Sequence, residues 1–134
     1  MPEIMINSYE LTIQSWGALG LLLLVQLLVA DLIGIKSKHV PGTPPEQSHA
    51  NLLFRASRTV ANTNESIALY IILVLFCVFS GADATYTGYL SWAYVIGRAV
   101  YAVFYYVNQP TMRSVSFGIT LLVLIGLLVT GVMS

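Results

Sequence analysis

The sequence predicts an all-α membrane protein, a single domain over residues 1–134 built as an up-down bundle of four transmembrane helices. Composition is the first reason. Of the 134 residues, 57% are hydrophobic and 9% are charged, whereas a soluble domain averages about 25% charged residues. The second reason is four apolar runs, each long enough to cross a bilayer, which takes about 20 helical residues. Because open sheet edges cannot survive in lipid, runs of this length are predicted to be helices.

The four helices are expected at about residues 11–35, 51–81, 86–107 and 113–133. The first contains the run GALGLLLLVQLLVADLIG, and the second starts in polar sequence and continues into IALYIILVLFCVFS. The loop 36–50 is polar and holds three prolines, which break helices. The other two connections are short, and short connections make neighbouring helices antiparallel.

Basic residues are concentrated on one side of the predicted bundle. Four of them flank the loop 36–50, and Arg113 flanks the loop 108–112. The N-terminus, the loop between the second and third helices and the C-terminus contain no Lys or Arg. The positive-inside rule therefore predicts a multi-pass protein whose two basic loops are cytoplasmic and whose termini are not. The formal net charge is zero, so nothing indicates a nucleic-acid partner.

Polar residues on the second helix share one face. Arg58, Asn62 and Glu65 stand at i, i+4 and i+7, and Arg55 extends this face by one turn. The two arginines could instead anchor the helix end by extending their charged groups to lipid headgroups. Glu65 does not fit that alternative, because a carboxylate inside an apolar run is costly without a partner.

The third helix offers that partner. Arg98 lies roughly 15 Å from the cytoplasmic end at about 1.5 Å per residue, which is too deep for easy contact with headgroups. Arg98, Tyr101 and Tyr105 stand at i, i+3 and i+7 and share a face. We therefore expect an intramembrane ion pair between Glu65 and Arg98, which leaves the flanking Arg and Tyr side chains available for a ligand.

The fourth helix begins with a cation next to a hydroxyl. Arg113 and Ser114 together are suited to binding an anion or a thiolate, although Arg113 alone would also serve as an interfacial anchor. His39 and His49 share the first loop without a cysteine or a helical i, i+4 spacing. No metal site is expected from them.

Three patches resemble the membrane-associated proteins in eicosanoid and glutathione metabolism, which include microsomal glutathione transferases and prostaglandin E synthase. They are an Arg-x-x-x-Asn-x-x-Glu motif, a Gly-Arg followed by a tyrosine, and an Arg-Ser. The matching residues are Arg58, Asn62 and Glu65, then Gly97, Arg98 and Tyr105, and finally Arg113 and Ser114. The resemblance extends over the whole chain at the level of four spans and a basic first loop.

This resemblance implies a homotrimer that holds glutathione, as co-substrate, in clefts between protomers. It implies that Arg113 and Ser114 stabilise the glutathione thiolate, which attacks a lipophilic electrophile or hydroperoxide arriving from membrane lipid. The expected glutathione-binding residues are Arg55, Arg58, Asn62, Glu65, Arg98, Tyr101 and Tyr105.

Three residues that differ from the family pattern bear on the identity of the substrate. Ala61 stands where the prostaglandin and leukotriene enzymes of this family have an arginine, and Tyr101 stands where prostaglandin E synthase has a histidine. Phe117 replaces a tyrosine. These departures argue against eicosanoid synthesis. The leading hypothesis is a glutathione-dependent transferase or peroxidase. One alternative is a non-catalytic member that binds a lipid or a partner protein. Another is a small cation transporter, but such transporters have nearly balanced loop charges.

Overall fold

The computed structural model describes residues 2–134 and contains no strand within them, so the all-helical prediction is confirmed. The helices are α1 (Pro2–Ser8), α2 (Glu10–Lys36), α3 (Leu52–Phe79), α4 (Ala84–Tyr106) and α5 (Pro110–Val132). The four long helices overlap the four predicted ranges. The short α1 lies where no helix was predicted.

Side chains at the helix ends explain where the long helices begin. Asn51 caps α3, since its Oδ1 accepts hydrogen bonds from the backbone N–H groups of Leu53 and Phe54 at 2.9 and 3.3 Å. Helix α5 begins at Pro110, earlier than the predicted position 113. The reason is that a proline in the first turn has no N–H to leave unpaired and has its φ already set for the helix.

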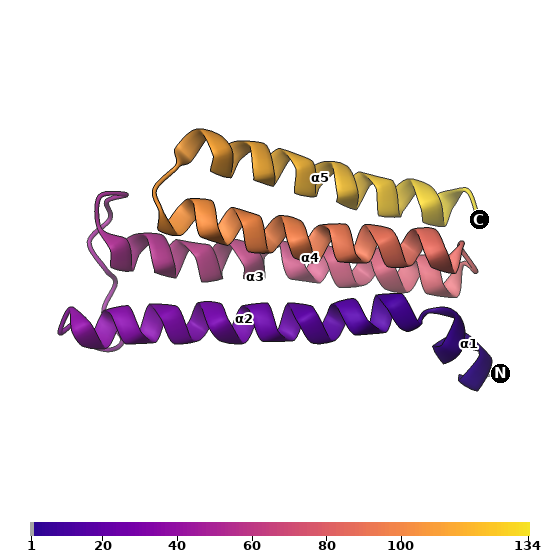
Figure 1. The fold of residues 1–134 in the computed structure, drawn as a ribbon, viewed down its shortest axis with the longest axis horizontal. Coiled ribbons are helices and arrows are strands. Elements are labelled where there is room, and N and C mark those ends of the chain that lie inside the picture. The colour runs from indigo at the N-terminus through magenta and orange to yellow at the C-terminus, as the bar shows by residue number, and fades with distance from the viewer. Residues whose placement is uncertain (1) are drawn as a thin grey trace.

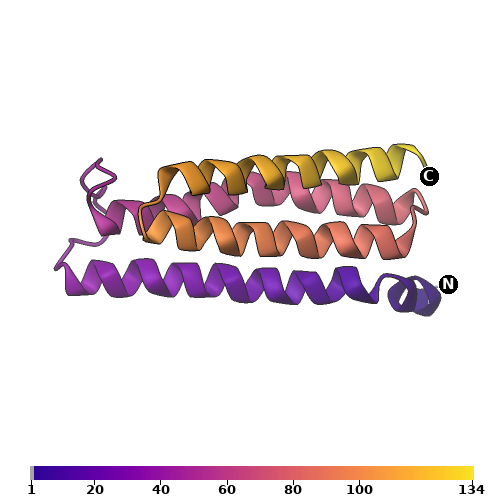
Figure 2. The same ribbon diagram turned by 45° about the horizontal axis from the view of Figure 1, so that its top comes forward.

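The long helices lie side by side, with both termini at one end of the bundle (Figures 1 and 2). The loop between α2 and α3 and the loop between α4 and α5 lie together at the opposite end (Figure 1). Both α3 and α4 pack against all three of the other long helices, so they form the middle of the bundle. The predicted site residues come mainly from these two helices and from the start of α5.

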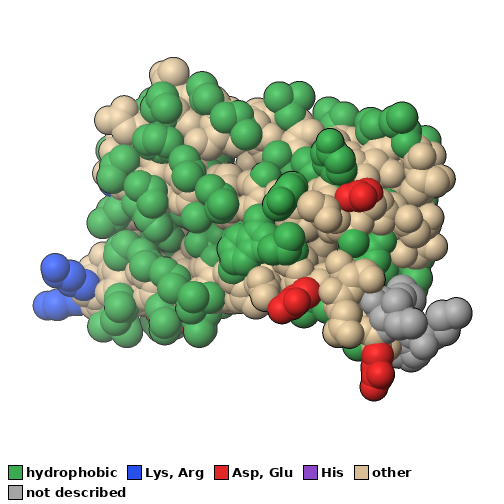
Figure 3. Space-filling model, turned by 45° about the vertical axis from the view of Figure 1, so that its right-hand side comes forward, with side chains coloured by type: hydrophobic (Ala, Val, Ile, Leu, Met, Phe, Trp, Pro, Cys, Tyr) green, Lys and Arg blue, Asp and Glu red, His purple; other side chains and the backbone are tan. Residues whose placement is uncertain are grey.

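Three helices, α2, α3 and α5, are long and apolar enough to cross a membrane. Helix α4 has 23 residues, but its tyrosines and Arg98 make it less apolar, so composition alone shows three spans and a fourth packed helix. Figure 3 shows a face that is largely hydrophobic, with Lys and Arg at one end and Asp and Glu toward the other. This distribution is consistent with an integral membrane protein.

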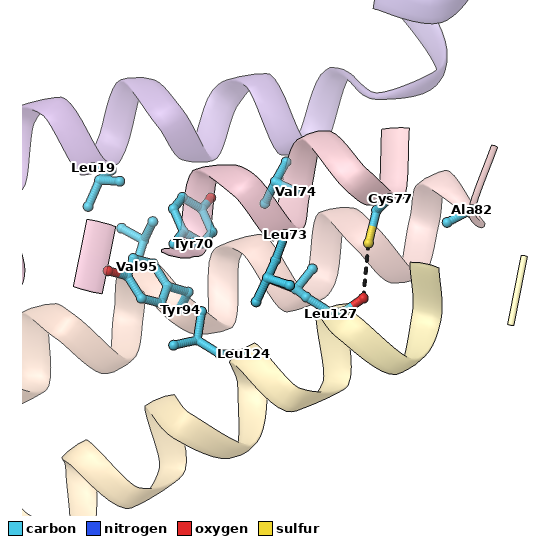
Figure 4. Close-up of a cluster of buried hydrophobic side chains, with 10 residues drawn as sticks. All are labelled: Leu19, Tyr70, Leu73, Val74, Cys77, Ala82, Tyr94, Val95, Leu124 and Leu127. Atoms are coloured by element: carbon cyan, nitrogen blue, oxygen red, sulfur yellow. Dashed lines mark hydrogen bonds between the residues drawn. The ribbon is translucent and has the colours of Figure 1, made fainter. Parts of the chain in front are cut away.

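A cluster of buried hydrophobic side chains fills the half of the bundle away from the basic loops (Figure 4). It draws on all four long helices, and at one edge the Cys77 thiol donates to the carbonyl oxygen of Leu127 at 3.1 Å. Its members are Leu19, Tyr70, Leu73, Val74, Cys77, Ala82, Tyr94, Val95, Leu124 and Leu127.

Two tyrosines in this cluster join three helices through hydroxyl contacts. The rings of Tyr70 and Tyr94 stack with centroids 4.0 Å apart and planes inclined by 5°. Their hydroxyl oxygens lie 3.1 Å from Ser15 Oγ and 2.7 Å from Ser66 Oγ, respectively. Hydrogen bonds between helices are well suited to lipid, where apolar packing has no hydrophobic driving force. The cluster thus joins the helices that carry the site nearer the loops.

Candidate functional site

A cavity of about 220 Å³ lies among α3, α4 and the first turns of α5. Its lining residues are Asn62, Tyr101, Arg113, Ser114 and Phe117. Four of these five were predicted as site residues, although they are spread over more than fifty positions of the sequence. The structure therefore brings the predicted cation, hydroxyl and amide to one cavity.

Arg113 is the cation at this cavity. Its guanidinium carbon lies 4.4 Å from the centroid of the Tyr105 ring, an arrangement in which the ring face attracts the positive charge. Within residues 2–134, no carboxylate lies at ion-pair distance from Arg113. The charge is held by a neutral ring and is thus available to an anion in the cavity.

Ser114 and Phe117 complete the α5 wall. The Ser114 hydroxyl donates to the carbonyl oxygen of Pro110 at 3.0 Å, a bond within the helix. It must rotate away from that carbonyl to donate to a ligand. The Phe117 ring has its centroid 6.3 Å from that of Tyr101, so one side of the cavity is aromatic and apolar.

Arg98 lies fully buried between α3 and α4. Its Nη2 donates to Asn62 Oδ1 at 2.5 Å and to Thr63 Oγ1 at 3.3 Å, and its guanidinium carbon lies 4.3 Å from the Tyr101 ring centroid. Its Nε and Nη1 have no hydrogen-bond partner among the described residues. A buried cation with neutral partners is costly to maintain, which makes this position a strong functional candidate.

The predicted ion pair between Glu65 and Arg98 is wrong. Glu65 instead pairs with Arg58 on its own helix, with 3.4 Å between Glu65 Oε1 and Arg58 Nη2. Asn62, about one turn before Glu65, occupies the position that meets Arg98. Positions seven residues apart lie two turns along one helix face, so long side chains at 58 and 65 reach each other. These two side chains are 40% and 59% exposed, on the outer side of α3.

Arg55 has a different environment from the other predicted binding residues. Its Nε and Nη2 each donate to the carbonyl oxygen of Tyr106 at 3.3 Å, and its Nη1 donates to that of His49 at 2.6 Å. Arg55 does not line the cavity. In this arrangement it ties the first loop to the end of α4.

His49 is a neighbour of the site that the sequence did not indicate. Its Nε2 lies 3.1 Å from the Tyr105 hydroxyl oxygen. In the sequence, His49 was weighed only as a possible metal ligand. No local pattern signals a contact between residues 56 positions apart. Among residues 2–134, no group of three His, Cys, Asp or Glu residues is placed to hold a metal ion.

A family model described as the MAPEG family matches residues 15–133. The chain belongs to the MAPEG family. This confirms the predicted resemblance and makes the protein a membrane protein of the family of glutathione and eicosanoid metabolism. No curated protein and no solved structure was found to match the chain.

In this MAPEG chain, Arg113 lines the cavity and two further arginines lie near it. The positive charges of Arg98, Arg113 and Arg58 all act on Tyr101, which lines it. Glu65 adds one negative charge on the outer side, paired with Arg58 and acting on Arg98 only at longer range. The site therefore has an excess of positive charge in a partly apolar setting, which favours an anionic ligand.

Proposed function

We propose that this protein is a glutathione-dependent membrane transferase or peroxidase that acts on lipophilic electrophiles or hydroperoxides. The observation that carries the proposal is Arg113, which borders the cavity beside Ser114 without a carboxylate partner in the described residues. A nearby cation lowers the pKa of a thiol and raises its thiolate fraction at neutral pH. Only the thiolate is a strong nucleophile.

The charges around the cavity match those of glutathione. The tripeptide has two carboxylates and one ammonium group. Arg58 and Arg98 are proposed to bind the carboxylates, and Glu65 is proposed to bind the ammonium group. Asn62 adds an amide whose oxygen already accepts from Arg98, so its amino group can donate to a ligand carbonyl. A charge-assisted pair at each end would orient the tripeptide with its sulfur toward Arg113.

The proposed reaction begins with the thiolate. With an electrophile, its sulfur forms a bond to carbon while the leaving group departs with its electron pair. With a hydroperoxide, sulfur attacks the terminal oxygen and the O–O bond breaks, and the leaving alkoxide takes a proton from water to become the alcohol. A second glutathione then attacks the sulfenic acid, which forms the disulfide and releases water. The aromatic wall of Tyr101 and Phe117 suits a lipophilic substrate. The basic loops that flank this site favour the cytoplasmic side for it, by the positive-inside rule.

The proposed assembly is a homotrimer with glutathione between copies. The cavity of about 220 Å³ is smaller than the roughly 300 Å³ at which ligand pockets usually begin. Arg58 and Glu65 are 40% and 59% exposed on an apolar helix, where charge facing lipid is costly. A neighbouring copy would cover this pair and enlarge the cavity. Native mass spectrometry of the detergent-solubilised protein is expected to show three copies, and a monomer alone would exclude a site shared between copies.

Glutathione binding and turnover test the proposed function. Calorimetric titration is expected to show binding at millimolar glutathione, and the protein is expected to conjugate a model aryl halide. S-methylglutathione is the matched control, because it keeps the carboxylates and the ammonium group but has no ionisable thiol. It is expected to bind without turnover. Absence of binding at millimolar glutathione would favour a non-catalytic member that binds a lipid or a partner protein.

A further inference from the structure

His49, near the end of the first loop, is held in place from three directions. Its ring stacks on that of Tyr105, with centroids 5.8 Å apart and planes inclined by 21°, and it meets the Phe54 ring edge-on at 5.1 Å. Its Nε2 lies 3.1 Å from the Tyr105 hydroxyl oxygen. Its carbonyl oxygen accepts a hydrogen bond of 2.6 Å from Arg55. A loop residue with this many directed contacts has a defined orientation.

The partner of His49 is the ring that supports the candidate thiol-activating cation. Tyr105 is 5% exposed, and the guanidinium carbon of Arg113 lies 4.4 Å from its ring centroid. The Tyr101 ring packs edge-on against it, with centroids 5.6 Å apart and planes inclined by 70°. A continuous path of contacts therefore runs from His49 through Tyr105 to Arg113.

We propose that His49 is a positioning residue for Arg113, an inference that rests on the proposed function. The hydrogen bond between His49 and the Tyr105 hydroxyl fixes the tyrosine ring, and the ring fixes the guanidinium that lies over it. Arg113 has no carboxylate partner among the described residues, so its orientation depends on this ring. The first loop thereby sets the geometry of the thiol site.

Four variants separate this role from general packing. His49→Phe keeps an aromatic ring between Phe54 and Tyr105 but removes the hydrogen bond, and Tyr105→Phe removes the same bond from the other side. The double variant shows whether the two act through one contact. His39→Phe is the matched control, because the Nε2 of His39 lies 2.7 Å from the Thr43 carbonyl oxygen within the loop.

The first measurement needs no glutathione. An arginine-directed dicarbonyl reagent is applied to the full-length protein, and mass spectrometry compares modification of Arg113 with that of Arg58 in the same sample. His49→Phe is expected to raise the relative rate about fivefold, the effect of one neutral hydrogen bond. Tyr105→Phe should do the same, and the double variant should add nothing. The control is expected to match the wild type.

The second measurement is the thiolate absorbance of bound glutathione, which should fall in the same variants. An unchanged Arg113 modification rate in His49→Phe, or effects that multiply in the double variant, would overturn the positioning role. A wild-type protein that forms no thiolate would instead refute the proposed function. In that case the modification rates still decide the role of His49 by themselves.

Discussion

Replacing Arg113 with methionine is expected to lower glutathione conjugation about a hundredfold, the usual loss when one preorganised stabilising group is removed from an active site. Methionine keeps the length and flexibility of the side chain but removes its charge. Without the cation, the glutathione thiol returns toward its ordinary pKa and the thiolate fraction at neutral pH falls. Steady-state kinetics would show the loss mainly in kcat, because other residues are proposed to hold the carboxylates and the ammonium group.

Two further variants make this expectation specific. Arg113→Lys keeps a positive charge and should recover part of the activity. Lys38→Met removes an exposed cation from the first loop and should leave turnover within about twofold of wild type, because surface charge pairs contribute little. Full activity in Arg113→Met would remove this residue from the thiol chemistry.

Replacing Arg98 with methionine is expected to stabilise the protein while weakening glutathione binding. Arg98 is fully buried, and its hydrogen-bond partners, Asn62 and Thr63, are neutral. Apolar replacements of buried ion pairs are often neutral or stabilising by about 1–4 kcal/mol, and no carboxylate among the described residues lies at ion-pair distance from Arg98 to offset the cost of its burial. Thr63 keeps its bond to the carbonyl oxygen of Thr59, so removing Arg98 leaves it satisfied. Removal of one buried positive charge beside the cavity should reduce glutathione affinity about tenfold.

Thermal unfolding and calorimetry of the same sample would measure both effects. Arg58→Met is the matched control, because that cation is partly exposed and already paired with Glu65. It should not stabilise the protein. A lower unfolding temperature in Arg98→Met would contradict the expectation, since it would mean that the bonds to Asn62 and Thr63 outweigh the cost of burying the charge.

The sequence predicted which residues share a helix face but not which of them meet across helices. Helical spacing placed Arg58 two turns before Glu65, and these two side chains pair along α3. The choice of Glu65 as the partner of Arg98 was wrong because spacing does not determine how a helix is rotated against its neighbour. That rotation presents Asn62 to α4 and leaves Glu65 on the outer side.

Contacts between a loop and a distant helix could not be predicted from local sequence patterns. His49 reaches Tyr105 across 56 positions, and nothing in the prolines and polar residues of the loop predicts that docking. Phe117 was noted only as a departure from the family motif, yet its ring lies against Tyr101 in the cavity wall. By contrast, Arg113 and Ser114 were predictable because a cation and a hydroxyl are adjacent in sequence at a helix start.

Helix α4 shows a limit of composition as a predictor. It was expected to span the membrane, yet it is not among the three helices that are apolar enough by composition to do so, because its tyrosines and Arg98 lower its hydropathy. It packs against α2, α3 and α5, and this packing buries Arg98 away from lipid. A helix in the middle of a bundle does not need an apolar surface all round, and one of the polar residues that lower its hydropathy, Tyr101, lines the cavity.

The difference absorbance of the thiolate, recorded while glutathione is titrated into the wild-type protein at neutral pH, shows whether the site ionises the glutathione thiol. Arg113→Met is measured beside it. A saturable thiolate signal is expected in the wild type, and its loss is expected in the variant. No thiolate signal at saturating glutathione, or an equal signal in Arg113→Met, would contradict it.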